Sequence, residues 1–361
     1  MKSTPKVLII PLDWGLGHAT RCIPIILYMQ SKGWEINLAG EGAIADLLSK
    51  EFPDVPLLPL KGYHITYPKK GWFFIPKIII QIPKIIQAII HEHKWLKEQI
   101  KSHHWNLIIS DNRYGLFTQY AKTILITHQV SPHTGFGKIM DTLLRKVIYQ
   151  FIGRFDACWV PDSADDQNIS GNLSHVPDAP KNLHYVGPIS RLNSTNRLQE
   201  HYILILLSGP EPQRSILEKI LIEQAIGLEE KFVFVRGLPS AQNERDDLEN
   251  IQFINHVSAE KLAVLIEQSK MVICRTGYST VMDLLKLKKR GLMIPTPGQT
   301  EQEYLGKRMK YLTWYVVQDQ GDIDLEKGIA KCLGTPRSFP NFDFDAYKKQ
   351  IDYFGIQYFG V

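Results

Sequence analysis

The stretch from Met271 to Leu285, MVICRTGYSTVMDLL, constrains the fold more than any other part of the chain. Its first residues, Met271–Cys274, form a short apolar run with two β-branched side chains, which predicts a buried strand. The run breaks at Arg275–Gly277, and we expect Ser279 or Thr280 to cap the helix that follows. A strand, a glycine turn and a helix N-terminus in this order predict an anion-binding site at the end of the strand.

Asp283 lies about one turn inside the predicted helix. Its carboxylate is placed to accept two hydrogen bonds from a ribose diol while a diphosphate binds at the turn. An ordinary strand–helix connection with a polar cap explains the same residues. The segment alone therefore leaves both interpretations open.

The run from Asn255 to Asp283 resembles the donor-binding half of family 28 glycosyltransferases. A proline and a Gln-rich loop follow in that family, and Pro295–Gly306 matches them here. Within the family, the chain resembles the bacterial branch that transfers N-acetylglucosamine to the lipid-linked peptidoglycan precursor. The positions that match the family's motif are Phe253, Ile254, Val257, Arg275, Thr276, Gly277, Thr280 and Asp283.

The resemblance implies that the C-terminal half binds a UDP-sugar. It places the backbone near Ile254 against the uracil and Arg191 near the donor phosphate, although a solvated linker position explains Arg191 equally well. The chain departs from the family at the Gly-rich phosphate loop, of which only Ser208 and Gly209 remain, and at Glu303, which replaces one of two glutamines that bind the sugar. The predicted donor-binding residues are Arg191, Ser208, Gly209, Ile254, Arg275, Thr276, Gly277, Ser279, Thr280, Asp283, Gln299, Gln302 and Glu303.

Strand and helix signals alternate along the chain with few hairpin signals, which predicts parallel sheets. A chain of 361 residues with 44% hydrophobic residues can bury two cores. We therefore predict an α/β protein with two Rossmann-like domains facing a cleft, the GT-B type. The expected domains are an acceptor-binding domain over 1–190 and a nucleotide-sugar-binding domain over 200–335. The tail 336–361 is expected, from this architecture, to pack back on the first domain.

The segment DWGLGHATR, residues 13–21, follows a predicted strand at Lys6–Leu12. Its glycines, Gly15 and Gly17, let the backbone turn close to a ligand, although the spacing is not that of a dinucleotide site. By resemblance this loop faces the acceptor, and His18 is the candidate general base. Asp111 ends another predicted strand and is the candidate carboxylate that orients His18. A histidine that only packs at a helix start, and an aspartate that only caps a turn, remain open alternatives.

Residues 61–104 differ from their surroundings in composition. They contain eight lysines and two acids, for a net charge of +6 without histidine, together with aromatic residues and a helical apolar pattern. Lysine, aromatic and amphipathic character together are typical of a helix that contacts an anionic membrane surface. A core helix with snorkelling lysines explains the pattern equally well. We keep both hypotheses for Lys61–Lys101.

Other features limit the partners and the compartment. The net charge of +5 and pI of about 8.8 are too small to argue for a nucleic-acid partner. No uncharged run of about 18 residues is present, so we predict no transmembrane helix. The first apolar run ends at Asp13 and predicts a strand, not a signal peptide. The four cysteines are far apart, which favours reduced thiols in the cytosol: Cys22, Cys158, Cys274 and Cys332.

The sequence spells DxD twice, at Asp322–Asp324 and at Asp343–Asp345, but neither follows a buried apolar strand. We therefore predict no metal site and no cofactor. The predicted function is an inverting, metal-independent glycosyltransferase that moves a sugar, N-acetylglucosamine in the nearest branch, from a UDP-sugar to a lipid-linked or glycan acceptor. The predicted location is cytoplasmic and peripheral to the inner face of the membrane. A UDP-sugar epimerase of the same architecture and a non-catalytic nucleotide-sugar binder are the alternatives.

Overall fold

The computed structural model describes residues 4–65, 74–195, 200–238, 245–336 and 338–361. It divides into two compact units, each built on its own parallel sheet. Unit 1 comprises Met1–Thr66, Ile78–Ile189 and Phe342–Val361, and unit 2 comprises Tyr67–Lys77 and Ser190–Asn341.

The sheet of unit 1 has seven strands in the order β3-β2-β1-β4-β5-β6-β7, and every neighbouring pair is parallel. The strands are β1 (Lys6–Pro11), β2 (Glu35–Gly40), β3 (Leu57–Pro59), β4 (Leu107–Asp111), β5 (Lys122–Ile126), β6 (Ala157–Val160) and β7 (Leu183–Tyr185). The strand expected at Lys6–Leu12 is confirmed as β1, which ends one residue earlier, and the strand expected to end at Asp111 is confirmed as β4.

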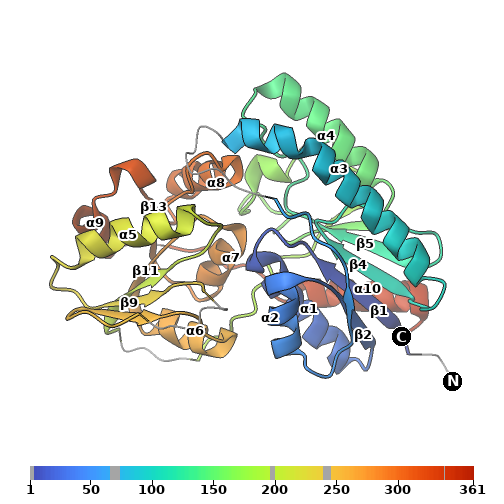
Figure 1. The fold of residues 1–361 in the computed structure, drawn as a ribbon, viewed down its shortest axis with the longest axis horizontal. Helices are drawn as coiled ribbons and strands as arrows, with labels where there is room; N and C mark the ends of the chain where they lie inside the picture. The colour runs from blue at the N-terminus through green and yellow to red at the C-terminus, as the bar shows by residue number, and fades with distance from the viewer. Residues whose placement is uncertain (1–3, 66–73, 196–199, 239–244, 337) are drawn as a thin grey trace. The chain divides into compact units, whose positions relative to one another are not determined.

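Helices cover both faces of this sheet (Figure 1). Along β1, Val7 and Ile9 point to a core shared with α1 and α10, whereas Leu8 and Ile10 point to a core shared with α3. This alternation explains why the strand is apolar at every position after Lys6, since both of its faces are buried there. The helices are α1 (Leu16–Ser31), α2 (Gly42–Glu51), α3 (Phe74–Gln99), α4 (Lys138–Ile152) and α10 (Ala346–Phe359).

The tail helix α10 belongs to unit 1. Its residues Tyr347, Ile351 and Phe354 are buried in the same core as α1. Trp34 and Phe359 meet edge to face with ring centroids 5.9 Å apart. The tail therefore contributes to the core of the unit that begins the chain.

The sheet of unit 2 has six parallel strands in the order β10-β9-β8-β11-β12-β13. Its core joins the sheet to α5 and α9 through side chains such as Leu217 and Ile329. The strands are β8 (Tyr202–Leu206), β9 (Phe232–Val235), β10 (Ile251–Ile254), β11 (Ser269–Cys274), β12 (Gly291–Met293) and β13 (Val316–Val317). The helices are α5 (Gln213–Ala225), α6 (Ala259–Glu267), α7 (Tyr278–Lys286), α8 (Thr300–Tyr311) and α9 (Leu325–Gly334).

The predicted cap of α7 is wrong. The helix begins at Tyr278, and its N-cap residue is Gly277, so that Ser279 and Thr280 lie inside the first turn. The N–H of Val281 donates to the carbonyl of Gly277 at 2.9 Å. The glycine turn itself therefore starts the helix, and the hydroxyl residues one turn later are not needed as caps.

The two halves of the long helix α3 differ in burial, and each half fits one of the two interpretations of Lys61–Lys101. Its C-terminal half is core, since Glu92, Trp95 and Leu96 are buried. Its N-terminal half exposes isoleucines, among them Ile80, which is 78% exposed. Lys69 and Lys70 lie outside the described residues.

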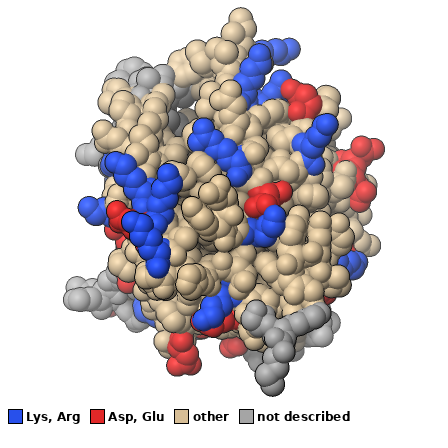
Figure 2. All heavy atoms as spheres, turned by 90° about the vertical axis from the view of Figure 1, so that its right-hand side faces the viewer, with Lys and Arg blue, Asp and Glu red and all other residues tan. Residues whose placement is uncertain are grey.

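None of the helices in the described part of the chain is long and apolar enough to cross a membrane. Figure 2 shows one face of the molecule, on which basic side chains form several separate groups with acidic side chains and uncharged surface between them. Such an interrupted pattern differs from the continuous basic stripe of nucleic-acid-binding proteins.

Candidate active site

The topology of unit 1 brings His18 and Asp111 to one place. The chain runs from β1 outward through β2 and β3, then returns to start β4 on the other side of β1. The gap between β1 and β4 is therefore the switch point, where open α/β sheets bind ligands beyond the carboxyl ends of their strands. Gly15, with φ of 139°, turns the chain after β1, and His18 lies in the first turn of α1. Asp111 ends β4.

His18 and Asp111 are in direct contact at this switch point. The Nδ1 atom of His18 lies 2.9 Å from Oδ1 of Asp111. Asp111 is fully buried, while the His18 side chain keeps 16% of its surface exposed. Since Nδ1 faces the carboxylate, Nε2 is the ring nitrogen left for a ligand.

Arg21 lies one turn further along α1. It joins His18 and Asp111 in what we call the His18 cluster, together with Cys22 and His128. Its Nε donates to Oδ2 of Asp111 at 2.5 Å, and its Nη2 donates to Oδ1. Nη2 also lies 2.9 Å from Nδ1 of His18, and Nη1 lies 3.1 Å from Nδ1 of His128, which follows β5. A guanidinium only donates, so Nδ1 of His128 accepts this bond. Cys22 contributes its thiol, with Sγ 3.7 Å from Oδ2 of Asp111.

The electrostatics of the cluster keep the carboxylate charged and the imidazole neutral. Burial raises the pKa of Asp111, but the charge of Arg21 and the hydrogen bonds from Arg21 and His18 outweigh it and hold this pKa well below its usual range. Burial lowers the pKa of His18 below its usual value, and Arg21 acts in the same direction against the opposing effect of Asp111. A histidine in this state is neutral at pH 7, as a general base must be.

The loop around Asp13 is fixed by hydrogen bonds to the segment after β3. Oδ1 of Asp13 accepts from the N–H of Tyr63 at 2.9 Å, and Oδ2 accepts from the N–H of His64 at 3.2 Å. A Cβ at Gly62 would lie 2.2 Å from the Asp13 carboxylate, so only glycine fits there. Trp14 packs edge to face on Tyr63, with ring centroids 6.0 Å apart. The segment carrying Gly15 and Gly17 is therefore anchored next to His18.

Unit 2 has its own switch point, between β8 and β11, where two helix N-termini follow the strand ends. The start of α5 already holds a carboxylate. Glu211 accepts from Nε of Arg214 at 2.6 Å and from the N–H of Ser215 at 3.3 Å. A phosphate at this helix would meet that negative charge. The loop keeps Gly209 with a φ of 99° and a half-buried Ser208.

The start of α7 is the more open anion site. Its N-cap residue is Gly277, which has no side chain, and a Cβ built there would meet only Thr280 Oγ1, at 3.7 Å. Neither packing nor backbone conformation requires glycine at this position. The missing side chain leaves the helix N-terminus approachable, where backbone N–H groups and the helix dipole favour an anion.

Asp283 lies one turn further along α7 and is only partly satisfied. Its Oδ1 accepts from Oγ of Ser190 at 2.5 Å. Burial raises the pKa of Asp283 to about 6, although the Ser190 bond and the charges of Arg191 and Lys286 oppose that rise. A half-buried carboxylate with one hydroxyl donor has unused hydrogen-bonding capacity, which is typical of a ligand site.

Two predicted donor residues form bonds within the protein. Arg275 is buried, and its Nη groups donate to the carbonyls of Gln213 at 2.8 Å and Pro295 at 3.1 Å. These bonds join Arg275 to the main chain, and its predicted role in donor binding stays a prediction. The hydroxyl of Thr276 donates to the carbonyl of Gln302 at 2.8 Å. Both residues therefore hold the strand ends together.

The Gln-rich loop is also held by its own side chains. Oε1 of Gln302 accepts from the N–H of Thr296 at 2.9 Å, and Oε1 of Glu303 accepts from the N–H of Gly298 at 2.6 Å. Within the described residues, Oε1 of Gln299 and Oγ1 of Thr296 are buried without a hydrogen-bond partner. These two atoms have unused hydrogen-bonding capacity, whereas Oε1 of Gln302 is engaged within the protein. At the far strand of the sheet, the Ile254 carbonyl accepts from the N–H of Arg236 at 2.8 Å.

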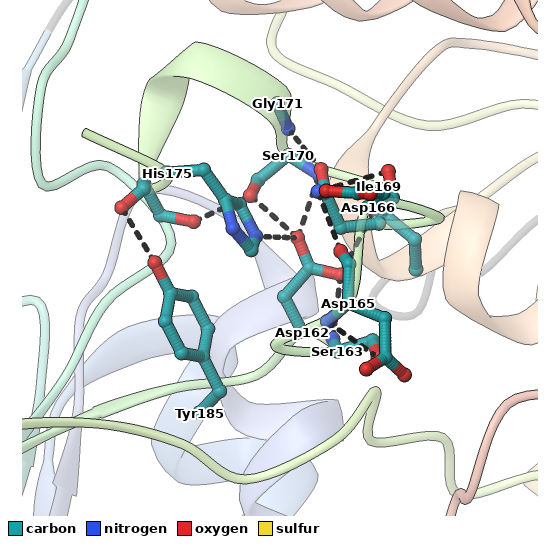
Figure 3. Close-up of polar contacts among 11 residues, drawn as sticks. Asp162, Ser163, Asp165, Asp166, Ile169, Ser170, Gly171, His175 and Tyr185 are labelled. Carbon is teal, nitrogen blue, oxygen red and sulfur yellow. Dashed lines mark hydrogen bonds and ion pairs between the residues drawn. The ribbon is translucent and has the colours of Figure 1, made fainter. Parts of the chain in front are cut away.

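Figure 3 shows a second polar network in unit 1, centred on Asp162 after β6. Its carboxylate accepts from the N–H groups of Ile169 and Ser170 at 2.9 and 2.7 Å, and from the Ser170 hydroxyl. His175 lies 3.5 Å away and stacks on Tyr185, with ring centroids 4.5 Å apart. All of these donors come from the loop that follows β6, so Asp162 shapes that loop.

Within the described residues, no group of three or more histidine, cysteine, aspartate or glutamate side chains is arranged to hold a metal ion. The DxD aspartates have other contacts. Asp324 caps α9 by accepting from the N–H of Lys327 at 3.0 Å, and Asp343 pairs with Lys349 at 2.9 Å.

Sequence reasoning missed Arg21 and Ser190. The spacing of His18 and Arg21, three residues apart on one helix, places both side chains on the same face and was the available signal. For Ser190 there was no such signal, since 93 residues separate it from Asp283.

Comparisons with known proteins agree with this geometry. Residues 215–336 match the model of the glycosyltransferase family 28 C-terminal domain. An uncharacterized glycosyltransferase of Methanosarcina mazei is 24% identical over 314 residues, which cover 82% of this chain and 81% of that protein. The UDP-N-acetylglucosamine–N-acetylmuramyl-(pentapeptide) pyrophosphoryl-undecaprenol N-acetylglucosamine transferase of Buchnera aphidicola is 22% identical over 310 residues, covering 83% and 80%.

Among solved structures, the glycotransferase of kitacinnamycin superposes with a TM-score of 0.67 at 12% identity, covering 98% of this chain and 94% of that one. The chain is a glycosyltransferase built from two Rossmann-like domains, the GT-B architecture. More particularly, it is similar to family 28 glycosyltransferases in unit 2, which contains the matched residues 215–336.

Proposed function

We propose that this glycosyltransferase is inverting and metal-independent, and that it transfers N-acetylglucosamine from its UDP-sugar to a hydroxyl of a lipid-linked acceptor. The observation that carries the proposal is the contact of His18 with the buried Asp111 at the switch point of unit 1. The Buchnera aphidicola relative, whose name states a UDP-N-acetylglucosamine donor and an undecaprenol-linked acceptor, supports the choice of substrates.

In the proposed reaction, Nε2 of His18 takes the proton of the acceptor hydroxyl. The oxygen attacks the anomeric carbon of the donor sugar, and the bond from that carbon to the diphosphate oxygen breaks. UDP leaves with the electron pair of that bond. Asp111 keeps His18 oriented and stabilises the imidazolium that forms. Attack opposite the leaving group inverts the configuration of the anomeric carbon.

Unit 2 is the proposed donor domain. The diphosphate binds at the N-terminus of α7, where Gly277 leaves the backbone open and the helix dipole stabilises the leaving group. The ribose diol donates to Asp283. Gln299 and Thr296 offer their unpartnered oxygen atoms to the sugar hydroxyls.

The proposed acceptor is reached at an anionic bilayer through an apolar surface on α3 and α4. Figure 1 shows both helices on unit 1, and Phe117 links them, stacking on His93 of α3 at 4.4 Å and lying under Arg154, just after α4, at 5.0 Å. Exposed lysines border this surface and favour anionic lipid. Its exposed apolar side chains are Ile80, Ile82, Ile86, Ile90, Ile139, Met140, Leu143, Leu144 and Val147.

We place the enzyme at the cytoplasmic face of that membrane. All four cysteines are buried and form no disulfide bond, as expected in a reducing compartment.

The function is tested by screening UDP- and TDP-sugars for binding, followed by arrays of lipid-linked and glycan acceptors. Transfer from UDP-N-acetylglucosamine with inversion, unaffected by a metal chelator, supports the proposal. Conversion of the sugar nucleotide without any acceptor identifies an epimerase instead. Tight UDP binding with no turnover on any acceptor identifies a nucleotide-sugar binder.

The membrane surface is tested by flotation with vesicles that contain an anionic lipid. We expect the protein to float at low salt and to do so less as salt rises, because lysines near such a surface contribute about 1 kcal/mol each. The double change Ile139→Ser and Leu143→Ser should reduce flotation several-fold. The matched control is Ile226→Ser, which changes a similarly exposed isoleucine of unit 2. Equal loss in both variants, or no flotation at low salt, contradicts a membrane-binding surface at α3 and α4.

A further inference from the structure

Arg21 connects the carboxylate and the two imidazoles of the His18 cluster. It lies within hydrogen-bonding distance of Asp111, His18 and His128, and it is 2% exposed. Burying a guanidinium is costly unless its donors are well used, so this position requires an explanation. The geometry offers one, because Nε and Nη2 point as a fork at the carboxylate that orients the proposed base.

We propose that Arg21 is a positioning residue for catalysis, whose guanidinium fixes and compensates the Asp111 carboxylate so that this carboxylate orients His18 without holding it as an imidazolium. The inference rests on the proposed role of His18 as the base. It concerns a group that touches neither substrate, since Arg21 acts only through Asp111 and His18.

The argument follows from what each donor can do. Nε and Nη2 of Arg21 donate to Asp111, and Nη1 donates to His128. Nδ1 of His18 lies 2.9 Å from both Oδ1 of Asp111 and Nη2 of Arg21. Because Nη2 already donates to Asp111 and the ionised carboxylate can only accept, we assign the ring proton to Nδ1, from which it is donated to Oδ1. The lone pair is then on Nε2, on the side of the ring available to a ligand. A buried aspartate without a cation would instead hold the proton of a neighbouring histidine.

Among the described residues, the charged and titratable groups that act on His18 belong to this cluster. They are Asp111 from the end of β4, Arg21 from α1 and His128 from the segment after β5. Asp111 raises the pKa of His18, whereas burial, Arg21 and His128 lower it. Removing Arg21 therefore leaves the opposing effect of Asp111 uncompensated, and the pKa of His18 should rise.

The experiment is an NMR titration of the His18 ring in the full-length protein, with the signal assigned by its loss in His18→Gln. In the wild type we expect a titration midpoint below 6.5 and ¹⁵N shifts that place the proton of the neutral ring on Nδ1. In Arg21→Gln the midpoint should rise by about 1–3 units, since one opposing charge is gone. In Arg21→Lys, which keeps the charge but loses the fork, the rise should be smaller.

The matched control is Arg113→Lys. Arg113 forms another buried ion pair of unit 1, with its Nε 2.8 Å from Oε1 of Glu92, and its loss should cost similar stability without moving the midpoint of His18. An unchanged midpoint in a folded Arg21→Gln protein overturns the proposal, as does an equal rise in the Arg113 control. If Arg21→Gln does not fold, the Arg21→Lys titration and the wild-type tautomer decide, and a proton on Nε2 of the neutral ring overturns it.

Turnover gives an independent readout once an acceptor is known. The acid side of the pH–rate profile of Arg21→Lys should move in the same direction as the NMR midpoint, with KM for the UDP-sugar unchanged. A uniform loss of kcat at every pH, with no shift of the profile, indicates a structural role and contradicts the inference. The NMR result needs no substrate, so it distinguishes failure of this inference from failure of the proposed reaction.

Discussion

The two units share a parallel-sheet topology with a switch point, but the aspartates near these switch points, Asp111 and Asp283, have different hydrogen-bond partners. In unit 1 the buried Asp111 receives donors from Arg21, His18 and Cys22, and its charge is compensated inside the protein. In unit 2 the half-buried Asp283 receives one hydroxyl, and burial raises its pKa to about 6. One aspartate is saturated by protein groups, whereas the other keeps capacity for a partner that the chain does not supply.

This difference teaches how one topology supports two tasks. A carboxylate that orients a base must be held rigidly, because the base has to keep one tautomer and one direction through the reaction. A carboxylate that binds a ligand must leave lone pairs open, and it loses stability in the empty protein for that reason. Asp111 fits the first description and Asp283 the second.

The largest expected effect tests the unit 1 side. His18→Ala removes the proposed base and should lower turnover by about 10²–10⁴-fold, the usual contribution of a general base. UDP affinity measured by calorimetry should stay unchanged, because the proposed donor residues all belong to unit 2. The control His104→Ala alters an exposed histidine of the same unit and should retain full turnover. Loss of UDP binding in His18→Ala would mean that the roles of the two units are assigned the wrong way round.

The second effect tests the unit 2 side. Asp283→Ala should weaken UDP binding by roughly 10- to 150-fold, the value of a hydrogen bond to a charged group at about 1.5–3 kcal/mol. Binding of inorganic diphosphate should change little, since it lacks the ribose and meets only the start of α7. Asp246→Ala, at an exposed position of unit 2, is the control. If a folded Asp283→Ala protein binds UDP as tightly as the wild type, Asp283 does not bind the ribose.

A third effect is the pH dependence of UDP binding. The ribose hydroxyls donate to the ionised carboxylate, and Asp283 loses that form as pH falls through about 6. UDP affinity should therefore decrease below pH 6, by at most about tenfold per pH unit for one group. In Asp283→Asn this dependence should disappear, apart from the titration of the UDP phosphate itself. If the wild type and Asp283→Asn show the same pH dependence of UDP affinity from pH 5 to 7, the Asp283 carboxylate does not bind UDP.

The sequence predicts the features of the fold that depend on local residue patterns. It predicts less well the contacts between residues that are far apart in the chain. Buried parallel strands appear in the sequence as apolar runs, so the ends of β1, β4 and β11 can be predicted to within one or two residues. Because carboxyl ends of parallel strands share an edge, His18 and Asp111 could be expected to lie together across 93 residues. The fold class came from the same local patterns.

The contacts of individual side chains at the sites were not predictable in the same way. Arg275 matches the family motif, yet it is bonded to the Gln213 and Pro295 carbonyls, which only the folded loops bring near it. Ser190 reaches Asp283 because the segment after β7 crosses α7, a path that no local pattern encodes. The start of α7 was misassigned because hydroxyl residues suggested a cap, while Gly277 began the helix without one.

The smallest expected effect is a change in folding stability, which should have opposite signs for substitutions at Asp283 and at Asp111. The pKa of Asp283 is raised from 3.8 to about 6 in the folded state, so the folded protein binds this proton more tightly than the unfolded chain does. The bound proton therefore contributes fully to the free energy of unfolding below about pH 4, and this contribution is lost as pH rises through 6. Asn at this position keeps an oxygen for Ser190 and carries no charge.

We therefore expect Asp283→Asn to be more stable than the wild type by about 1–3 kcal/mol at pH 7 to 8. The gain should shrink toward zero near pH 4, and Asp246→Asn should show no such pattern. Thermal unfolding across this pH range measures both. Asp111→Asn should give the opposite sign, since the pKa of Asp111 is lowered and its charge is paired with Arg21. A destabilised Asp283→Asn protein at pH 8 would show that Asp283 is as fully satisfied as Asp111, and the contrast between the two sites would fail.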